Sequence, residues 1–98
     1  MSQRLPFKSP TVIFRPMEDG GVLFCSRSEA YFGLSRVGAK IWEMLPDANS
    51  SVANSFDELI RSLQQTYTGV DAETLIADTR EFLERIGELE LTVDAPAT

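Results

Sequence analysis

Short apolar runs alternate with turn residues in the first part of the chain. The runs are rich in β-branched and aromatic residues, which is typical of strands, and Pro16 closes the first of them. Segments 18–21 and 26–29 are glycine-rich or polar, which indicates a tight turn after each of the first two runs. The predicted strands are residues 11–15, 22–25 and 30–34. Two successive hairpins predict an antiparallel three-stranded meander.

From Ser35 onward, apolar residues recur at helical spacing. Ser35 is the expected N-cap of a first helix over residues 36–45. The proline-, asparagine- and serine-rich stretch 46–54 predicts a loop. Ser55-Phe56-Asp57-Glu58 then has the pattern of a capping box, in which the Ser and Glu side chains each accept a free backbone N–H, and it begins a second helix that ends near residue 67.

A third and longer helix is predicted between Asp71, its expected N-cap, and Gly87. Residues 88–93 then alternate polar and apolar side chains, as a short closing strand would. The predicted fold class is α+β and winged-helix-like, a three-stranded antiparallel meander followed by three α-helices. One domain is expected at residues 11–93, between a flexible N-terminal arm at 1–10 and a flexible tail at 94–98.

Length and charge narrow the range of partners. A chain of 98 residues forms one domain with a modest core. The formal charge of −6 is uneven, because residues 1–50 carry six Lys/Arg against five Asp/Glu whereas residues 51–98 carry three against ten. Such an acidic half argues against a nucleic-acid partner, since affinity for phosphates comes from clustered Lys and Arg.

Two residue types that many catalytic and metal sites use are absent or rare in the sequence. The chain contains no histidine, the commonest general base and metal ligand, and only one cysteine, Cys25. One thiol allows neither an internal disulfide nor a thiolate zinc site. We therefore expect no enzyme activity, cofactor or metal. Apolar runs are too short to span a membrane and the start of the chain lacks a signal-like segment, so we expect no membrane partner and a cytoplasmic location.

Two segments carry a resemblance to a known family. Residues 31–45 (YFGLSRVGAKIWEML) resemble the strand-to-helix step of PqqD-like proteins, and residues 78–86 (DTREFLERI) are similar to the last helix of that family. Ser35 stands where the family has Asn, a change that keeps N-capping ability. The loop at 46–54 is longer than the usual turn. With the strands included, the resemblance covers roughly residues 11–91.

The resemblance implies a function. PqqD-like domains are RiPP recognition elements, which bind the leader segment of a ribosomally made precursor peptide and present it to a modifying enzyme or a leader peptidase. In the family, the leader adds as a strand to the third meander strand and lies against the third helix. The expected partners are therefore a precursor leader peptide and a maturation enzyme or leader peptidase.

The residues themselves suit strand addition. A meander leaves two free edges, and the third strand has no proline or lysine to block pairing. On the third helix, Ile76 and Leu83 lie on one shoulder of the apolar stripe beside Thr79 and Arg80, whereas Leu75, Phe82 and Ile86 centre it. Core packing and groove lining remain open alternatives for Tyr31, Ile76 and Leu83. The expected peptide-binding residues are Glu29, Ala30, Tyr31, Phe32, Gly33, Ile76, Thr79, Arg80 and Leu83.

Two alternative functions share this fold class. A winged-helix DNA-binding domain needs a basic recognition helix, yet residues 55–67 contain only Arg61 against Asp57 and Glu58. A dimerisation module would use the same strand edge to pair with a second copy, so a homodimer is the other alternative.

Overall fold

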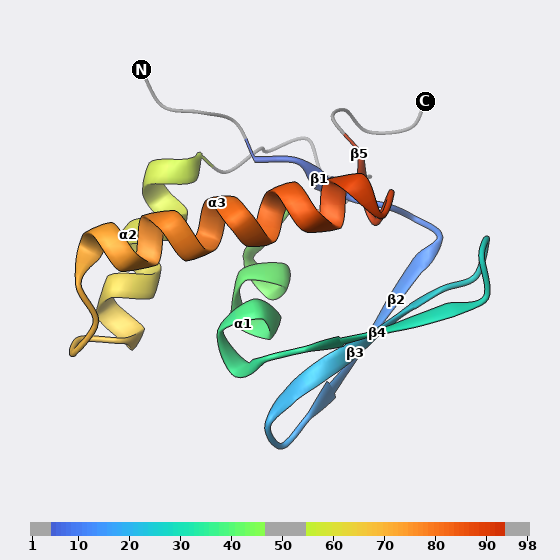
Figure 1. The fold of residues 1–98 in the computed structure, drawn as a ribbon, viewed down its shortest axis with the longest axis horizontal. Coiled ribbons are helices and arrows are strands. Elements are labelled where there is room, and N and C mark those ends of the chain that lie inside the picture. The colour runs from blue at the N-terminus through green and yellow to red at the C-terminus, as the bar shows by residue number, and fades with distance from the viewer. Residues whose placement is uncertain (1–4, 47–54, 94–98) are drawn as a thin grey trace.

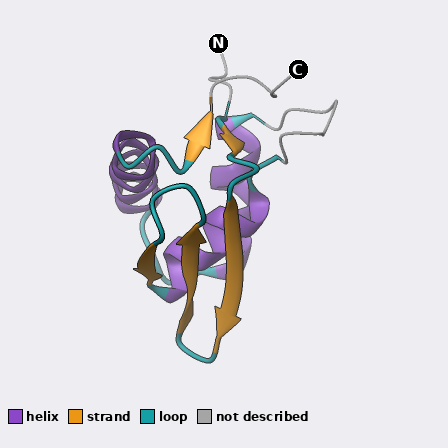
Figure 2. Ribbon diagram, turned by 90° about the vertical axis from the view of Figure 1, so that its right-hand side faces the viewer, coloured by secondary structure: helices purple, strands orange, loops and turns teal. Residues whose placement is uncertain are grey.

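A three-stranded sheet with three helices on one of its faces makes up most of the molecule (Figures 1 and 2). The computed structural model describes residues 5–46 and 55–93. Its strands are β1 (Phe7–Lys8), β2 (Val12–Met17), β3 (Gly20–Cys25), β4 (Ala30–Leu34) and β5 (Thr92–Val93). Its helices are α1 (Arg36–Met44), α2 (Phe56–Thr66) and α3 (Ala72–Glu88). The sheet order β2-β3-β4, all antiparallel, and the helices that follow confirm the predicted meander and α+β class.

The first hairpin is longer than the sequence predicts. Pro16 does not close β2, which continues to Met17 with Pro16 opposite Gly21. A proline is tolerated there because β2 is an edge strand, and a residue whose N–H position faces away from β3 loses no ladder hydrogen bond. The turn shrinks to Glu18 and Asp19, and both glycines belong to β3.

The helix starts follow from local capping. The Ser35 hydroxyl accepts a hydrogen bond from the Gly38 N–H at 3.1 Å, and the Ser55 hydroxyl accepts one from the Glu58 N–H at 3.2 Å, so both serines are N-caps as predicted. Of the predicted capping box, the described residues form only this half, without the return bond from the Ser55 N–H to the Glu58 side chain. Asp71 occupies the N-cap position of α3, but its side chain makes no capping hydrogen bond. Its carboxylate still lies at the positive end of the helix dipole, which favours a negative charge there.

The core lies between the sheet and the three helices. Each helix buries one stripe of apolar residues, and β3 contributes Leu23 from the middle of the sheet. Trp42 of α1 is only 2% exposed, so it is a core residue as its position in the apolar stripe suggests. The largest fully buried side chains are Trp42, Leu23, Ile41, Leu59, Leu63, Ile86, Leu91 and Thr79.

The segment just before β2 differs from the expected flexible arm. Phe7 and Lys8 form β1, which pairs antiparallel with β5 near the end of the described chain. Leu5, Phe7 and Ser9 are buried and alternate with more exposed neighbours, so one side of the segment packs on the core. The backbone N–H of Lys8 donates to Pro46 at 2.9 Å, and that of Ser9 donates to Leu91 at 3.1 Å. Residues 5–9 are therefore part of the domain.

Three predicted segments fall wholly or partly outside the described residues: the start of the arm at 1–4, most of the loop at 47–54 and the tail at 94–98. At the C-terminal side, α3 extends through Gly87 to Glu88, so the closing strand is limited to Thr92–Val93. Over the described chain, none of the helices has the length and apolar character that crossing a membrane requires.

Candidate functional site

The outer edge of β4 is free along its length. Within residues 5–46 and 55–93, β4 pairs only with β3, from Cys25↔Ala30 to Gly21↔Leu34. In an antiparallel pair, alternate residues direct both N–H and C=O away from the partner strand, so this edge offers hydrogen-bonding groups to a further strand. Ala30, Tyr31, Phe32 and Gly33 all lie on β4, as predicted. The other edge, β2, carries Pro16.

Glu29 lies just outside the strand. It ends the four-residue loop before β4 with a φ of 55°, a left-handed conformation that non-glycine residues adopt infrequently. Its side chain is exposed. Glu29 therefore lies in the hairpin loop, one residue before β4 begins.

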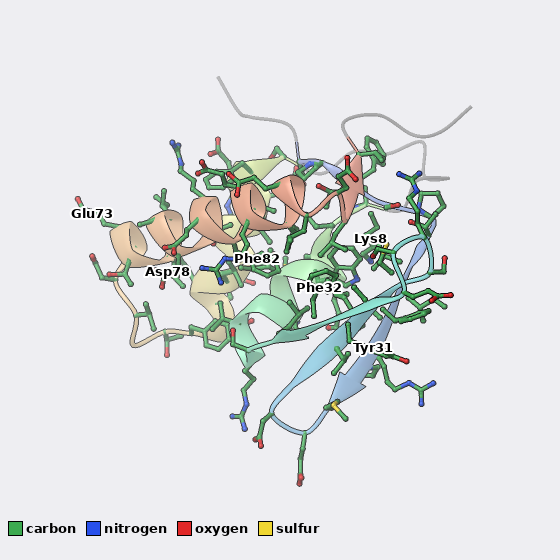
Figure 3. All side chains as sticks on the ribbon, turned by 45° about the vertical axis from the view of Figure 1, so that its right-hand side comes forward. Lys8, Tyr31, Phe32, Glu73, Asp78 and Phe82 are labelled. Carbon is green, nitrogen blue, oxygen red and sulfur yellow. The ribbon has the colours of Figure 1, made fainter. Side chains whose placement is uncertain are left out.

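The side chains of β4 divide between two faces. Phe32 and Leu34 are half-buried and pack against the core on the helix side, whereas Tyr31 is 73% exposed on the other side. Figure 3 shows Phe32 and Phe82 between the sheet and α3, with Tyr31 turned away. A strand added to β4 would have the same alternation, with every second side chain directed toward the helices.

A groove lies on that helix side, where β4 leads into α1 and α3 passes over it. It is a cavity of about 300 Å³, lined by Ser35, Val37, Gly38, Ile41, Asp78, Glu81, Phe82 and Arg85. Both ribbon views place α3 over the β4 side of the sheet (Figures 1 and 2). An extended chain on the β4 edge would therefore run beside this groove.

The groove has an apolar floor. Val37 and Ile41 come from α1 and Phe82 from α3, and all three line the cavity. Gly38 lets the two helices approach, because a Cβ there would lie 3.1 Å from the Phe82 ring. A larger residue at position 38 would press on Phe82, so glycine keeps the floor open.

The rim on α3 is charged. Arg85 Nη2 lies 3.8 Å from Glu81 Oε1, one helical turn away, and both side chains are more than two-thirds exposed. Asp78 is also exposed, and its carboxylate has no ion pair or side-chain hydrogen bond with any described residue. The rim therefore carries one neutralised pair and one unpaired negative charge.

The four α3 residues predicted to touch a peptide lie away from this groove. Thr79 is completely buried, and Ile76 and Leu83 are half-buried and pack against the core. The Arg80 guanidinium lies 5.3 Å from the centre of the Phe56 ring, which belongs to α2. At helical spacing Ile76 and Leu83 lie on the same side of α3 as Arg80, which is the side toward α2, whereas Phe82 lies on the opposite shoulder. Thr79 lies between the two shoulders, at the centre of the buried face. The periodicity of α3 shows both shoulders but not which one a neighbouring helix covers.

A second cavity lies on the uncovered face of the sheet. Its volume is about 410 Å³ and its lining is Ile13, Arg15, Met17, Val22, Phe24 and Tyr31. The rings of Phe24 and Tyr31 are 4.8 Å apart, so Tyr31 belongs to this outer face and not to the groove. This cavity lies over the middle of the strands, where backbone groups are already paired, whereas the groove adjoins a free edge. The groove is therefore the better site for an extended chain.

The described residues contain no cluster of three or more His, Cys, Asp or Glu side chains able to hold a metal ion. The single thiol, Cys25, is buried at the end of β3. Hydrogen bonds from Ser28, with smaller ones from Arg27 and Thr11, lower the pKa of the Cys25 thiol to about 7. Cys25 is not among the residues that line the groove. The β4 edge offers backbone pairing, and the groove beside it offers an apolar floor and the Asp78 carboxylate.

Comparison with known proteins gives two matches. A family model described as coenzyme PQQ synthesis protein D (PqqD) matches residues 20–91. A solved structure of TbiB1 in complex with the TbiA(beta) leader peptide is similar with a TM-score of 0.71 and 29% sequence identity, and the match covers 88% of this chain and 93% of the other. No curated protein matches the chain.

Proposed function

The chain belongs to the PqqD family, and from this premise we propose that it binds the leader segment of a ribosomally made precursor peptide. The leader pairs as an extra strand with β4 and places alternate side chains in the groove between α1 and α3. The observation that carries the proposal is the free β4 edge beside an apolar groove, in a chain that is similar over 88% of its length to a protein solved with a leader peptide.

The energetics require both parts of the site. Each new backbone hydrogen bond contributes only about 0.5–1.5 kcal/mol net, whereas ordering a flexible peptide costs about 2–5 kcal/mol or more. A few strand bonds alone therefore leave little net affinity. An apolar leader side chain on the floor formed by Val37, Ile41 and Phe82 contributes about 25 cal/mol for each Å² of apolar surface that it buries. This additional free energy raises the affinity above what the strand bonds provide.

The domain has a presenting role in this proposal and performs no catalysis itself. A maturation enzyme or leader peptidase in the cytoplasm acts on the precursor while the leader is held on β4. A leader on the β4 edge leaves the outer face of the sheet, around Tyr31 and Phe24, uncovered by the helices and open to such an enzyme.

A dimer that pairs two β4 edges would block the leader, so the leader-binding form is one in which this edge is free. The comparisons give no support to the DNA-binding alternative.

An amide NMR titration tests the proposal. The probe is a synthetic peptide that spans the leader of the precursor encoded beside this gene. We expect the largest shifts in residues 30–35, in the first turns of α1 and around Phe82. Shifts confined to the outer face around Ile13 and Phe24, or no binding at all, would contradict the proposal.

A pair of adjacent variants locates the groove. Phe82→Ala removes part of the floor and should weaken leader binding by at least about tenfold, the range of a central interface aromatic. Leu83→Ala is the matched control, because Leu83 is also half-buried against the core but lies on the α2 side of α3. Both variants lose some stability, so Kd is measured by calorimetry well below either melting temperature. Equal losses of affinity in the two variants would place the contact elsewhere.

A further inference from the structure

The rim of the groove carries a negative charge, that of Asp78, which forms no ion pair with residues 5–46 or 55–93. Of the three charged side chains on this side of α3, Glu81 and Arg85 pair with each other at 3.8 Å. Arg80, the other arginine of α3, lies over Phe56 on the far shoulder. Asp78 is left as an exposed carboxylate at the edge of an apolar cavity, without an ion-pair partner among the described residues.

Resting on the function proposed above, we propose that Asp78 is a specificity-determining residue of the groove. It selects leaders that carry a Lys or Arg side chain close to the apolar side chain bound on Phe82. An acidic leader residue at that point would meet Asp78 and be disfavoured, so one carboxylate both attracts the correct class of leader and rejects others.

The spacing of the two α3 residues fixes the expected leader pattern. Asp78 and Phe82 are four residues apart on a helix, which separates them by about 6 Å along its axis. Side chains on one face of a strand recur every two residues, or about 6.6 Å. In Figure 1 the long axes of β4 and α3 are roughly aligned, although their chains run in opposite directions, so a strand on the β4 edge extends alongside α3. The basic and apolar residues of the leader are therefore separated by one residue.

The Glu81–Arg85 pair makes the remainder of the rim less selective. Because the two charges lie within 4 Å, a leader side chain nearby sees little net field from them. Asp78 lies one turn before Phe82 and Arg85 less than one turn after it, so the unpaired charge is confined to one end of the groove. We therefore expect the leader to need a Lys or Arg only at the Asp78 end of the groove.

Matched charge variants test the role of Asp78. Asp78→Asn should weaken binding of the synthetic leader about threefold to fivefold at low salt, the range of an exposed ion pair, and the loss should shrink as salt is added. Glu84→Gln is the control, because it removes the same charge from an exposed position of α3 that does not line the groove. Equal weakening by both variants would reduce the effect to net charge and overturn the proposal.

Leader variants complete the test. Each Lys and Arg of the synthetic leader is changed singly to Gln, and one of these changes should weaken binding to the wild-type chain but not to Asp78→Asn. Reversal of both charges, Asp78→Lys with Glu at that leader position, should restore affinity. If the wild-type chain binds the leader yet no leader position couples to Asp78, the specificity role is overturned while the proposed function stands. If the wild-type chain does not bind the leader, the proposed function itself fails.

Discussion

Thr79 is the only residue in the described part of the chain whose buried side-chain oxygen lacks a hydrogen-bond partner. Its side chain is completely enclosed in the core beneath α3. A buried hydroxyl without a partner costs about 1–3 kcal/mol, because the hydrogen bonds it made to water in the unfolded chain are lost. Thr79 therefore weakens the fold at a position that has no contact with the groove.

Replacing Thr79 with valine tests this cost. Valine keeps the shape of threonine and removes the unsatisfied hydroxyl, so Thr79→Val should raise the free energy of unfolding by about 1 kcal/mol. Chemical denaturation measures the change, and the Kd for the leader should stay unaltered. Thr74→Val, at an exposed position of the same helix, should have little effect. A destabilised Thr79→Val protein would mean that the hydroxyl has a partner after all.

At the scale of elements, Gly20 allows the start of β3 to lie against the end of β4. It begins β3 with a φ of 146°, a conformation that side chains rarely allow. A Cβ at this position would overlap the carbonyl oxygen of Leu34, the last residue of β4. The start of β3 can thus lie against the end of β4 only because residue 20 is glycine, and this contact sets where β4 ends and α1 begins.

Gly20→Ala should therefore destabilise the domain by at least about 2 kcal/mol, since it combines backbone strain with a clash against main-chain atoms that cannot move aside easily. Thermal unfolding followed by circular dichroism measures the loss. Gly33→Ala is the control in β4, because a Cβ there would meet nothing within 4 Å and its effect should stay within about 0.5 kcal/mol. A mild Gly20→Ala effect would show that β3 and β4 can shift apart at this end.

The elements themselves could be predicted because their signals are local. The Ser35 cap, the β4 strand and the Ser55 cap each depend on a few adjacent residues, and each was predicted correctly. The groove depends on tertiary packing. Phe82 and Leu83 are neighbours with the same chemistry, and only the position of α2 decides which of them borders the groove. The sequence therefore indicated the two shoulders of α3 but not that Phe82, and not Leu83, lines the cavity beside α1.

At the scale of the whole molecule, the first and last strands of the described chain pair with each other. β1 and β5 pair near the C-terminal end of α3, and Leu5, Phe7 and Leu91 are buried residues of these end segments. The Lys8 ammonium lies 6.0 Å from the centre of the Trp42 ring, so the same segment also covers α1. The alternation of residues 5–9 is a strand signal, but it is only two periods long and is interrupted by Pro6. That brevity explains why the sequence suggested a loose arm.

The contribution of this closure to stability can be measured with Phe7→Ala. The Phe7 side chain is 7% exposed, and loss of a buried phenylalanine costs about 3–5 kcal/mol when its surroundings cannot collapse. A domain of this size has only about 5–15 kcal/mol of stability, so the variant should be largely unfolded at moderate temperature. Pro10→Ala, at an exposed position just beyond the segment, should leave the melting temperature nearly unchanged. If Phe7→Ala melts like the wild-type chain, residues 5–9 contribute little to the core, and the domain begins at residue 11 as the sequence suggested.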